Sequence, residues 1–324
     1  MSFSELRNII EGNSTFLVVS HIMPDGDSIG SLLSMADILK KMDKEVTCII
    51  NDTIPNKYRF LPGIENIIEE KELKCDVLIA LDCGDEERLG LSQKLRNYAK
   101  TIVNIDHHKS NSEFGDLNLI YENASSVGEI IYLIAKDFGI TIDYAMALCI
   151  YTSIITDTGS IKYSNTTPTA LRILADLTEI GVQPDYISRK VFETKSREYT
   201  TLLKMALDTL EIYNENISVI SITKNMMEES KAKEEDTDGM INFAREIEGV
   251  EVAVLLREKD DSTIKVGLRS NEWCDVSKIA EEFDGGGHAR ASGCNFKGSL
   301  SKAKKEILEC IMKHMAEDMN ARNI

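Results

Sequence analysis

The sequence has 324 residues, of which 43% are hydrophobic, a length and apolar content that suit about two domains with packed cores. Lys and Arg number 37 and Asp and Glu number 54, so the formal net charge at pH 7 is −17. Such an acidic chain argues against non-specific binding of duplex nucleic acid, which depends on basic surface. A short anionic substrate stays compatible with it, provided that metal ions and a few placed cations bind that substrate.

Neither an export signal nor a membrane span is predicted. The first residues, Met1–Glu5, lack the basic region and following apolar stretch of a signal peptide. No apolar run approaches the roughly 20 residues that cross a bilayer. The seven cysteines show no paired spacing, which is typical of reduced thiols and predicts a cytoplasmic protein. Each is interpreted as a small buried apolar residue, and Cys83 is given no catalytic role.

The first half of the chain alternates strand and helix patterns. Apolar, β-branched runs predict strands, and apolar residues at helical spacing predict helices. The alternation is typical of an α/β domain with a mostly parallel sheet flanked by helices on both faces. The predicted elements are helix 3–11 capped by Ser4, strands 15–20, 45–50, 76–81 and 101–105, and helices 27–41, 125–138, 143–156, 169–180 and 184–193.

A domain boundary is predicted near Glu193–Ser196, where charged and small polar residues interrupt the apolar pattern. It divides the chain into residues 1–194 and a smaller α/β domain, residues 195–324. The acidic run Glu228–Asp238 is interpreted as a solvated loop and helix start. The predicted elements of the second domain are helix 197–212, strands 217–222, 251–257, 263–269 and 292–296, and helices 238–247, 275–282 and 300–317.

Carboxylate and imidazole side chains stand at or directly after the ends of four predicted elements. Ligands bind at the carboxyl ends of parallel strands, so these segments can converge on one site. Their oxygen and nitrogen atoms suit two hard-to-borderline divalent ions. Each residue can instead be a helix cap, a turn residue or a satisfied polar side chain, but those interpretations must then hold at all four places at once. The side chains are His21, Asp25, Asp27, Asp82, Asp106, His107, His108 and Asp157.

A run of glycines near the C-terminus is a second candidate binding segment. Gly285-Gly286-Gly287 permits positive φ and close approach of backbone N–H groups to an anion. His288 and Arg290 add donors beside it, and Arg269, at the end of a predicted strand, is a candidate cation. From the residues alone, a plain glycine turn with surface arginines is an equally good interpretation.

Five motifs in order resemble the signature of the DHH phosphoesterase superfamily and its DHHA1 domain. The resemblance covers roughly the whole chain. It implies an N-terminal DHH catalytic domain, a C-terminal DHHA1 substrate-binding domain and an active-site cleft between them. The motifs are His21–Gly30 (HIMPDGDSIG), Asp82, Asp106-His107-His108, Asp157 and Gly285–Gly293 (GGGHARASG).

The resemblance also implies two metal ions and assigns their ligands, with Asp82 as the bridge. The mixture of oxygen and some nitrogen ligands favours Mn²⁺, with Mg²⁺ or Co²⁺ as alternatives. Two such ions neutralise charge on a phosphoryl group and supply a deprotonated water. The first implied ligand set is His21, Asp25 and Asp82. The second is Asp27, Asp82, His107 and Asp157.

The other motif residues are implied to act on the substrate. His108 is expected not to bind metal but to stabilise charge at the scissile phosphate or protonate the leaving oxygen. Asp106 is expected to orient a histidine. Asp106, and likewise Ser164 and Thr166 as phosphate contacts, can equally be ordinary polar residues. The implied substrate contacts are Gly286, Gly287, His288, Arg269, Arg290, Ser164 and Thr166, with Arg257 and Lys109 as weaker candidates.

Within the superfamily, the chain resembles NrnA-type oligoribonucleases and 3′-phosphoadenosine-5′-phosphate (pAp) phosphatases, notably at Asp157–Ser160 and Tyr163–Thr167. Exonucleases of the RecJ type carry an added nucleic-acid-binding domain, and phosphodiesterases of the GdpP type carry membrane spans. The implied activity is metal-dependent hydrolysis of short RNA, of linear dinucleotides such as pGpG and pApA, and of pAp. A cyclic-dinucleotide (c-di-AMP) phosphodiesterase and a nucleotide sensor without turnover stay open as alternatives. No membrane partner and no stable duplex binding are expected, and a homodimer is left open.

Overall fold

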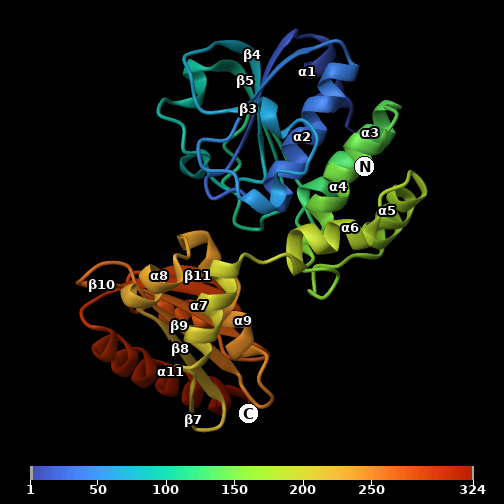
Figure 1. The fold of residues 1–324 in the computed structure, drawn as a ribbon. Coiled ribbons are helices and arrows are strands. Elements are labelled where there is room, and N and C mark those ends of the chain that lie inside the picture. The colour runs from blue at the N-terminus through green and yellow to red at the C-terminus, as the bar shows by residue number, and fades with distance from the viewer. Residues whose placement is uncertain (1–2, 323–324) are drawn as a thin grey trace. The chain divides into compact units, whose positions relative to one another are not determined.

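The computed structural model describes residues 3–322, with side chains described as far as residue 318. The chain folds into two compact units, Met1–Thr194 and Lys195–Ile324, each with its own sheet and core (Figure 1). Among the residues described, no helix is both long enough and apolar enough to cross a membrane.

The first unit is built on a sheet of six parallel strands, which confirms the predicted mostly parallel α/β fold. The three central strands are buried along most of their length, so their sequences are nearly continuous apolar runs. In spatial order the strands are β3 (Ile67–Ile68), β2 (Glu45–Ile49), β1 (Thr15–Ser20), β4 (Cys75–Leu81), β5 (Ala99–Asp106) and β6 (Leu117–Ile120).

Helices cover one face of this sheet, where Phe16 and Val77 belong to the larger core. The opposite face, with Leu17 and Leu78, packs against Leu89 and other residues of short 3-10 turns. The expected helices on both faces are thus α-helices on one face and 3-10 turns on the other. The helices are α1 (Ser4–Glu11), α2 (Gly26–Lys41), α3 (Val127–Phe138), α4 (Tyr144–Asp157), α5 (Pro168–Glu179) and α6 (Pro184–Ser188). The 3-10 turns η3 (Glu87–Leu89) and η4 (Leu95–Asn97) cover the second face, whereas η1 (Asn56–Tyr58), η2 (Ile64–Asn66) and the π-helical η5 (Arg189–Glu193) pack in the larger core beside the α-helices.

Small residues let three helices of the first unit pack closely. A Cβ on Gly30 of α2 would clash with the carbonyl oxygen of Cys149 in α4 and would lie 3.0 Å from Ser153 Cβ. A Cβ on Gly128 of α3 would overlap the same serine side chain. Ser153 of α4 therefore lies where α2, α3 and α4 meet. This contact fixes the N-terminal turns of α2 and α3.

The second unit is a mixed sheet with helices on both faces. Strands β8 and β9 are parallel, and all other neighbours are antiparallel. In spatial order the strands are β11 (Gly286–His288), β12 (Ala291–Lys297), β10 (Thr263–Ser270), β9 (Val252–Glu258), β8 (Ile217–Ile222) and β7 (Glu211–Tyr213). Helices α10 (Val276–Glu281) and α11 (Leu300–Arg322) pack on one face. Helices α7 (Arg197–Leu207), α8 (Lys224–Ser230) and α9 (Met240–Arg245) pack on the other, beside the turn η6 (Glu234–Thr237).

Several predicted boundaries are wrong for identifiable reasons. Ser4 is not a cap, because α1 begins at Ser4 and its N-cap residue is Phe3, whose ring is buried against Tyr121. The helix predicted over 197–212 ends at Leu207, because the next residues pair with β8 in a hairpin and form β7. The two-residue or edge strands β3, β6, β7 and β11 and the helix α8 were not predicted, since short segments carry too little periodicity.

We expect Gly30→Ala to lower the free energy of unfolding by about 1–3 kcal/mol, because the new methyl group overpacks the contact between α2 and α4. Chemical denaturation of the full chain measures this. Gly286→Ala is the matched control, since no atom lies within 4 Å of the position of its Cβ. Equal stability of the two variants would show that α2 and α4 can separate without cost.

Candidate metal centre

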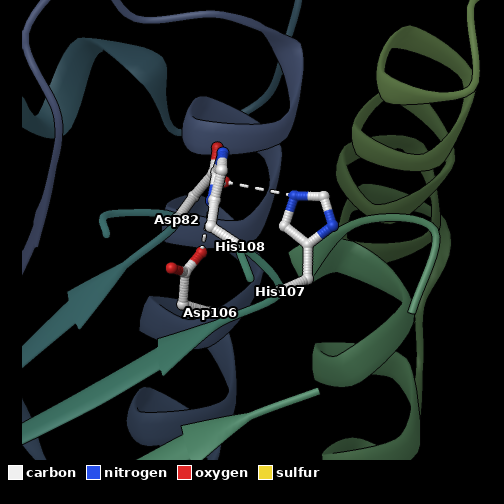
Figure 2. A group of neighbouring side chains, drawn as sticks. All are labelled: Asp82, Asp106, His107 and His108. Atoms are coloured by element: carbon white, nitrogen blue, oxygen red, sulfur yellow. Dashed lines mark hydrogen bonds and ion pairs between the residues drawn. The ribbon is translucent and has the colours of Figure 1, made fainter. Parts of the chain in front are cut away.

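The candidate site forms at the carboxyl ends of three adjacent strands. His21 directly follows β1, Asp82 follows β4, and Asp106 is the last residue of β5, with His107 and His108 next. Because the sheet order places β4 between β1 and β5, the three strand ends lie side by side. Figure 2 shows Asp82, Asp106 and both histidines gathered at these strand ends.

The start of α2 contributes two carboxylates. Asp25, for which a plain turn is the alternative, is the N-cap residue and accepts a hydrogen bond from the Ser28 backbone N–H at 2.9 Å. Asp27, in the first turn, is buried and accepts hydrogen bonds from the backbone N–H groups of Val127 (2.8 Å) and Gly128 (3.1 Å) at the start of α3. The Ser153 hydroxyl donates a third, at 2.5 Å. Helix N-termini and a buried hydroxyl thus hold Asp27 in place.

Asp82 faces a different histidine with each of its oxygens. Its Oδ2 lies 3.4 Å from His21 Nε2, and its Oδ1 lies 3.6 Å from His107 Nε2. The residue is 3% exposed and has φ of 55°, in the left-handed region that a non-glycine residue rarely adopts. Such backbone strain is found at functional sites, and here it turns the carboxylate from the strand end toward both imidazoles.

Two groups of ligand atoms result, one on each side of Asp82. His21, Asp25 and Asp82 each offer an atom within 4.8 Å of the others, and so do Asp27, His107 and Asp157. In the first group, His21 Nε2 lies 4.0 Å from Asp25 Oδ1. In the second, His107 Nε2 lies 3.8 Å from Asp27 Oδ2 and 3.7 Å from Asp157 Oδ2. The structure therefore brings together all six side chains predicted as metal ligands.

Both histidines of these groups present Nε2 to the carboxylates. The carbonyl oxygen of Ile22 lies 2.8 Å from His21 Nδ1, and that of Ala124 lies 3.2 Å from His107 Nδ1. A carbonyl can only accept, so Nδ1 is the donor and the Nε2 lone pair is left for a ligand bond. The separations of 3.4–4.0 Å from Nε2 to carboxylate oxygens exceed a hydrogen bond and suit two ligands of one ion. The donor set of these residues fits divalent metal ions.

Crowding of acids gives the site its electrostatic character. Burial, and then the charges of Asp27, Asp25 and Asp157, raise the pKa of Asp82 well above its ordinary value. Burial and the charge of Asp27 likewise raise the pKa of Asp157 to about 8. Divalent cations would let all of these carboxylates ionise together at neutral pH.

Asp106 and His108 form a hydrogen-bonded pair next to Asp82, whose Oδ1 lies 3.7 Å from His108 Nδ1. Asp106 Oδ1 accepts a hydrogen bond from His108 Nδ1 at 2.7 Å, drawn in Figure 2, and its Oδ2 accepts one from Asn111 Nδ2 at 2.6 Å. Although burial alone would raise it, the bond from His108 keeps the pKa of Asp106 below its usual value. The same bond raises the pKa of His108. The pair favours a charged imidazolium on an ionised carboxylate.

Several polar residues that hydrogen-bond to the predicted site residues were not predicted from the sequence. Asn165 Nδ2 donates to Asp157 Oδ2 at 3.1 Å, and Asn111 Nδ2 donates to Asn104 Oδ1 at 2.8 Å as well as to Asp106. Asn104 lies inside a buried strand, and Ser153 lies inside an almost wholly apolar helix. A polar residue in such a run is a signal that could have found both, because a buried polar group needs a partner.

The hydroxyl residues predicted as phosphate contacts lie in the loop after α4. Ser164 is exposed, whereas Thr166 is partly buried. Within the described part of the chain, Thr166 Oγ1, Asn165 Oδ1 and Ser125 Oγ are buried without a hydrogen-bond partner. Since Asn165 Nδ2 also donates to the Ser125 carbonyl oxygen at 3.0 Å, these atoms belong to one polar patch beside Asp157.

The remaining predicted contacts belong to the second unit. Gly286, Gly287 and His288 form the exposed edge strand β11, and Gly287 has φ of 139°. Arg269 Nη1 donates to the Leu268 carbonyl oxygen, and Arg290 Nη1 donates to that of Cys274. Two weaker candidates differ in their exposure, since Arg257 is buried and paired with Glu234, whereas Lys109 of the first unit is exposed.

Cys83 is buried next to Asp82, and its thiol donates to the Asp85 carbonyl oxygen. Burial raises the pKa of this thiol to about 12, so it is not a reactive thiolate at neutral pH.

Two family models match the sequence. The DHH family, N-terminal domain, matches residues 15–154, and the DHHA1 domain matches residues 202–316. Relatives named bifunctional oligoribonuclease and PAP phosphatase NrnA include one from Thermus thermophilus, 29% identical and covering 96% of this chain and 93% of the relative. The Bacillus subtilis relative of the same name is 26% identical, covering 90% and 92%.

Solved structures match over the same length. An exopolyphosphatase-related protein from Bacteroides fragilis is 29% identical with a TM-score of 0.91, covering 96% of this chain and 95% of that one. RecJ from Thermus thermophilus, at 12% identity, has a TM-score of 0.54 and covers 97% of this chain and 54% of its own. The second likeness concerns the fold alone.

We expect the chelated protein to lose stability as pH rises from about 5 to about 8. Folding raises the pKa of Asp157 from 3.8 to about 8, so the folded state binds the proton more tightly and the free energy of unfolding falls with rising pH in that interval. The slope is at most about 1.4 kcal/mol per pH unit for each such group. Thermal melting with EDTA or with excess Mn²⁺ measures this, and the added ion should abolish the loss.

Asp157→Asn should flatten the pH profile of the chelated protein, whereas Asp185→Asn, at an exposed position of α6, should leave it unchanged. An Asp157→Asn profile as steep as that of the wild type would show that this carboxyl keeps an ordinary pKa.

Proposed function

This chain belongs to the DHH family, with a DHHA1 domain following its DHH domain, and is a hydrolase; from that premise we propose that it cleaves phosphate esters of short oligoribonucleotides and of pAp. The position of Asp82 carries the proposal, because its two oxygens face His21 and His107 separately, as a carboxylate shared by two ions would. The carboxylate and imidazole groups suit phosphoryl chemistry, which needs charge neutralised at the phosphate.

The proposed ligand sets follow the two groups on either side of Asp82. His21, Asp25 and Asp82 would hold one ion. Asp27, Asp82, His107 and Asp157 would hold the other. Mn²⁺ is the proposed ion, since oxygen ligands dominate and each set includes one imidazole. Two ions bound by these residues would neutralise charge on the phosphoryl group and lower the pKa of a bound water molecule.

His108 is the proposed proton donor to the leaving oxygen. Its Nδ1 is held by Asp106, which leaves Nε2 as the atom that can reach a substrate, and its side chain is 27% exposed. The bond to Asp106 raises the pKa of His108, which favours the protonated ring that a leaving oxygen needs. Its role as a donor explains why this histidine pairs with Asp106 rather than presenting Nδ1 as a ligand.

The proposed substrates follow from the names of the relatives, oligoribonuclease and PAP phosphatase. Linear dinucleotides such as pGpG and pApA are the shortest diesters of this class. Thr166, which belongs to the polar patch with Ser125 and Asn165 beside Asp157, is a proposed contact to a phosphate or ribose hydroxyl. Further proposed contacts, which supply N–H groups, hydroxyls and cations, are Ser164, Arg269, Gly286, Gly287, His288 and Arg290.

Hydrolysis of pApA, pAp, c-di-AMP and a longer RNA at equal concentration, with Mn²⁺, tests this assignment. The proposal expects pApA and pAp to be cleaved faster than the other two. Faster cleavage of c-di-AMP would identify a cyclic-dinucleotide phosphodiesterase. Binding without turnover of any of them would identify a sensor, for which the pairing of His108 with Asp106 has no use.

Asp82→Asn should lower kcat/KM at least about 100-fold, because shared charge stabilisation of the transition state is worth several kcal/mol. Asparagine tolerates positive φ, so the fold should be retained. Cys83→Ser is the matched control, adjacent in sequence and buried, and should keep near wild-type turnover. Wild-type turnover in Asp82→Asn would remove this carboxylate from the site.

His108→Ala should lower kcat by about 10²–10⁴-fold and leave the bound metal unchanged, since a proton donor acts mainly in the transition state. Metal content and kcat of the purified variant measure these two effects. Loss of one metal ion per chain would instead make His108 a ligand.

A further inference from the structure

The second unit contains another cluster of metal-ligating side chains, built from residues that the proposed hydrolysis does not use. Glu282, Cys310 and His314 each offer one ligand atom within 4.8 Å of the others. Glu282 is the C-cap residue of α10, whereas Cys310 and His314 lie one turn apart on α11 and so share a face of that helix. The cluster therefore joins two helices that pack on the same face of the sheet.

The spacing of the three ligand atoms matches a small tetrahedral ion. His314 Nε2 lies 2.8 Å from Glu282 Oε1, and Cys310 Sγ lies 3.3 Å from Glu282 Oε2. Zinc binds carboxylate oxygen at about 2.0 Å, imidazole nitrogen at about 2.1 Å and thiolate sulfur at about 2.3 Å, which separates neighbouring ligand atoms by about 3.3–3.5 Å. One ligand atom from each of the three residues lies within 4.8 Å of the other two, so side-chain rotations would bring all three onto one ion.

The histidine is also oriented as a metal ligand is. Its other ring nitrogen, Nδ1, lies 3.7 Å from Glu317 Oε2, so a carboxylate stands behind the ring while Nε2 faces the cluster. The separation exceeds a hydrogen bond, so this carboxylate acts on the ring through its charge, which strengthens the ligand. Cys310 and His314 are 7% and 9% exposed, whereas Glu282 is exposed, which gives an ion a route of entry from solvent.

An ion pair is the simpler interpretation of part of this cluster. Lys313 Nζ lies 3.0 Å from Glu282 Oε1, and its side chain is 58% exposed. The thiol of Cys310 donates to Glu282 Oε2 in the same arrangement, and burial and Glu282 raise its pKa to about 12 and keep it neutral. An exposed lysine can swing into solvent when an ion binds Glu282, so it competes with the ion without blocking it.

We propose that Glu282, Cys310 and His314 form a zinc site that fastens α10 to α11, with water as the fourth ligand. Sulfur, nitrogen and carboxylate oxygen together favour zinc over manganese. Binding replaces the thiol proton of Cys310, which passes to solvent, by a sulfur–metal bond. The proposal does not depend on the hydrolysis proposed for the first unit, whose ligands include no cysteine.

Titration of the chelated full chain with Co²⁺ tests the site, because only a cobalt–thiolate bond gives an intense near-ultraviolet charge-transfer band. We expect a band whose final intensity corresponds to one thiolate-bound Co²⁺ per chain and that excess Zn²⁺ removes, since Co²⁺ bound by the carboxylates and imidazoles of the first unit gives no such band. Cys310→Ser should abolish it, and Glu282→Gln, at an exposed position, should weaken Co²⁺ binding at least tenfold. Lys313→Ala should strengthen binding, since it removes the competing cation.

Two controls separate this site from other metal binding. Cys294→Ser, in β12 of the same core and equally buried, should keep the band. Asp82→Asn should keep it as well, whatever its effect on hydrolysis. Absence of the band in the wild type, or a band that survives Cys310→Ser, would reduce the cluster to the ion pair of Glu282 with Lys313 and His314.

Discussion

The first unit is arranged around the burial of several carboxylates against one another at the ends of three strands. Like charges so close in a dry environment repel, and burial raises the pKa of Asp82 and Asp157 accordingly. The surrounding chain compensates in part. The N–H groups that start α3 donate to Asp27, Asn165 donates to Asp157, and backbone carbonyls turn the Nε2 atoms of two histidines toward the acids. Divalent ions can supply the rest of the compensation. A parallel sheet suits such a site because its central strand ends lie next to one another.

The sequence alone predicts the central strands and the convergence of the acids, because each acid ends a nearly continuous apolar run and such runs form adjacent parallel strands. It does not predict how each side chain is aimed. The positive φ of Asp82 and the hydrogen bonds behind Asp106 and Asp157 depend on contacts between segments far apart in the chain. Individual site roles therefore stay predictions, although the placement of the residues agrees with them.

The second unit was harder to predict for a related reason. Its edge strands β7 and β11 have three residues each, too few for a pattern of alternating polarity, and they form because a neighbouring strand supplies hydrogen bonds. The glycine run, expected as a loop, is an exposed strand for this reason. Likewise, Glu282 lies 28 residues before Cys310 in sequence, so only the packing of α10 on α11 shows that they meet.

The contact of Ser153 with α2, α3 and Asp27 links core packing to the position of a proposed ligand. In evolutionary terms, the packing of these three helices and the position of Asp27 cannot change independently of each other. A lineage that adapts to a new temperature by repacking these helices would move a carboxylate of the site at the same time. On the opposite face of the sheet, the residues of the 3-10 turns that pack there, such as Leu89 and Leu95, are not among the predicted ligands. Sequence drift among homologues should therefore be slower at the interface of the three helices than on the turn-covered face.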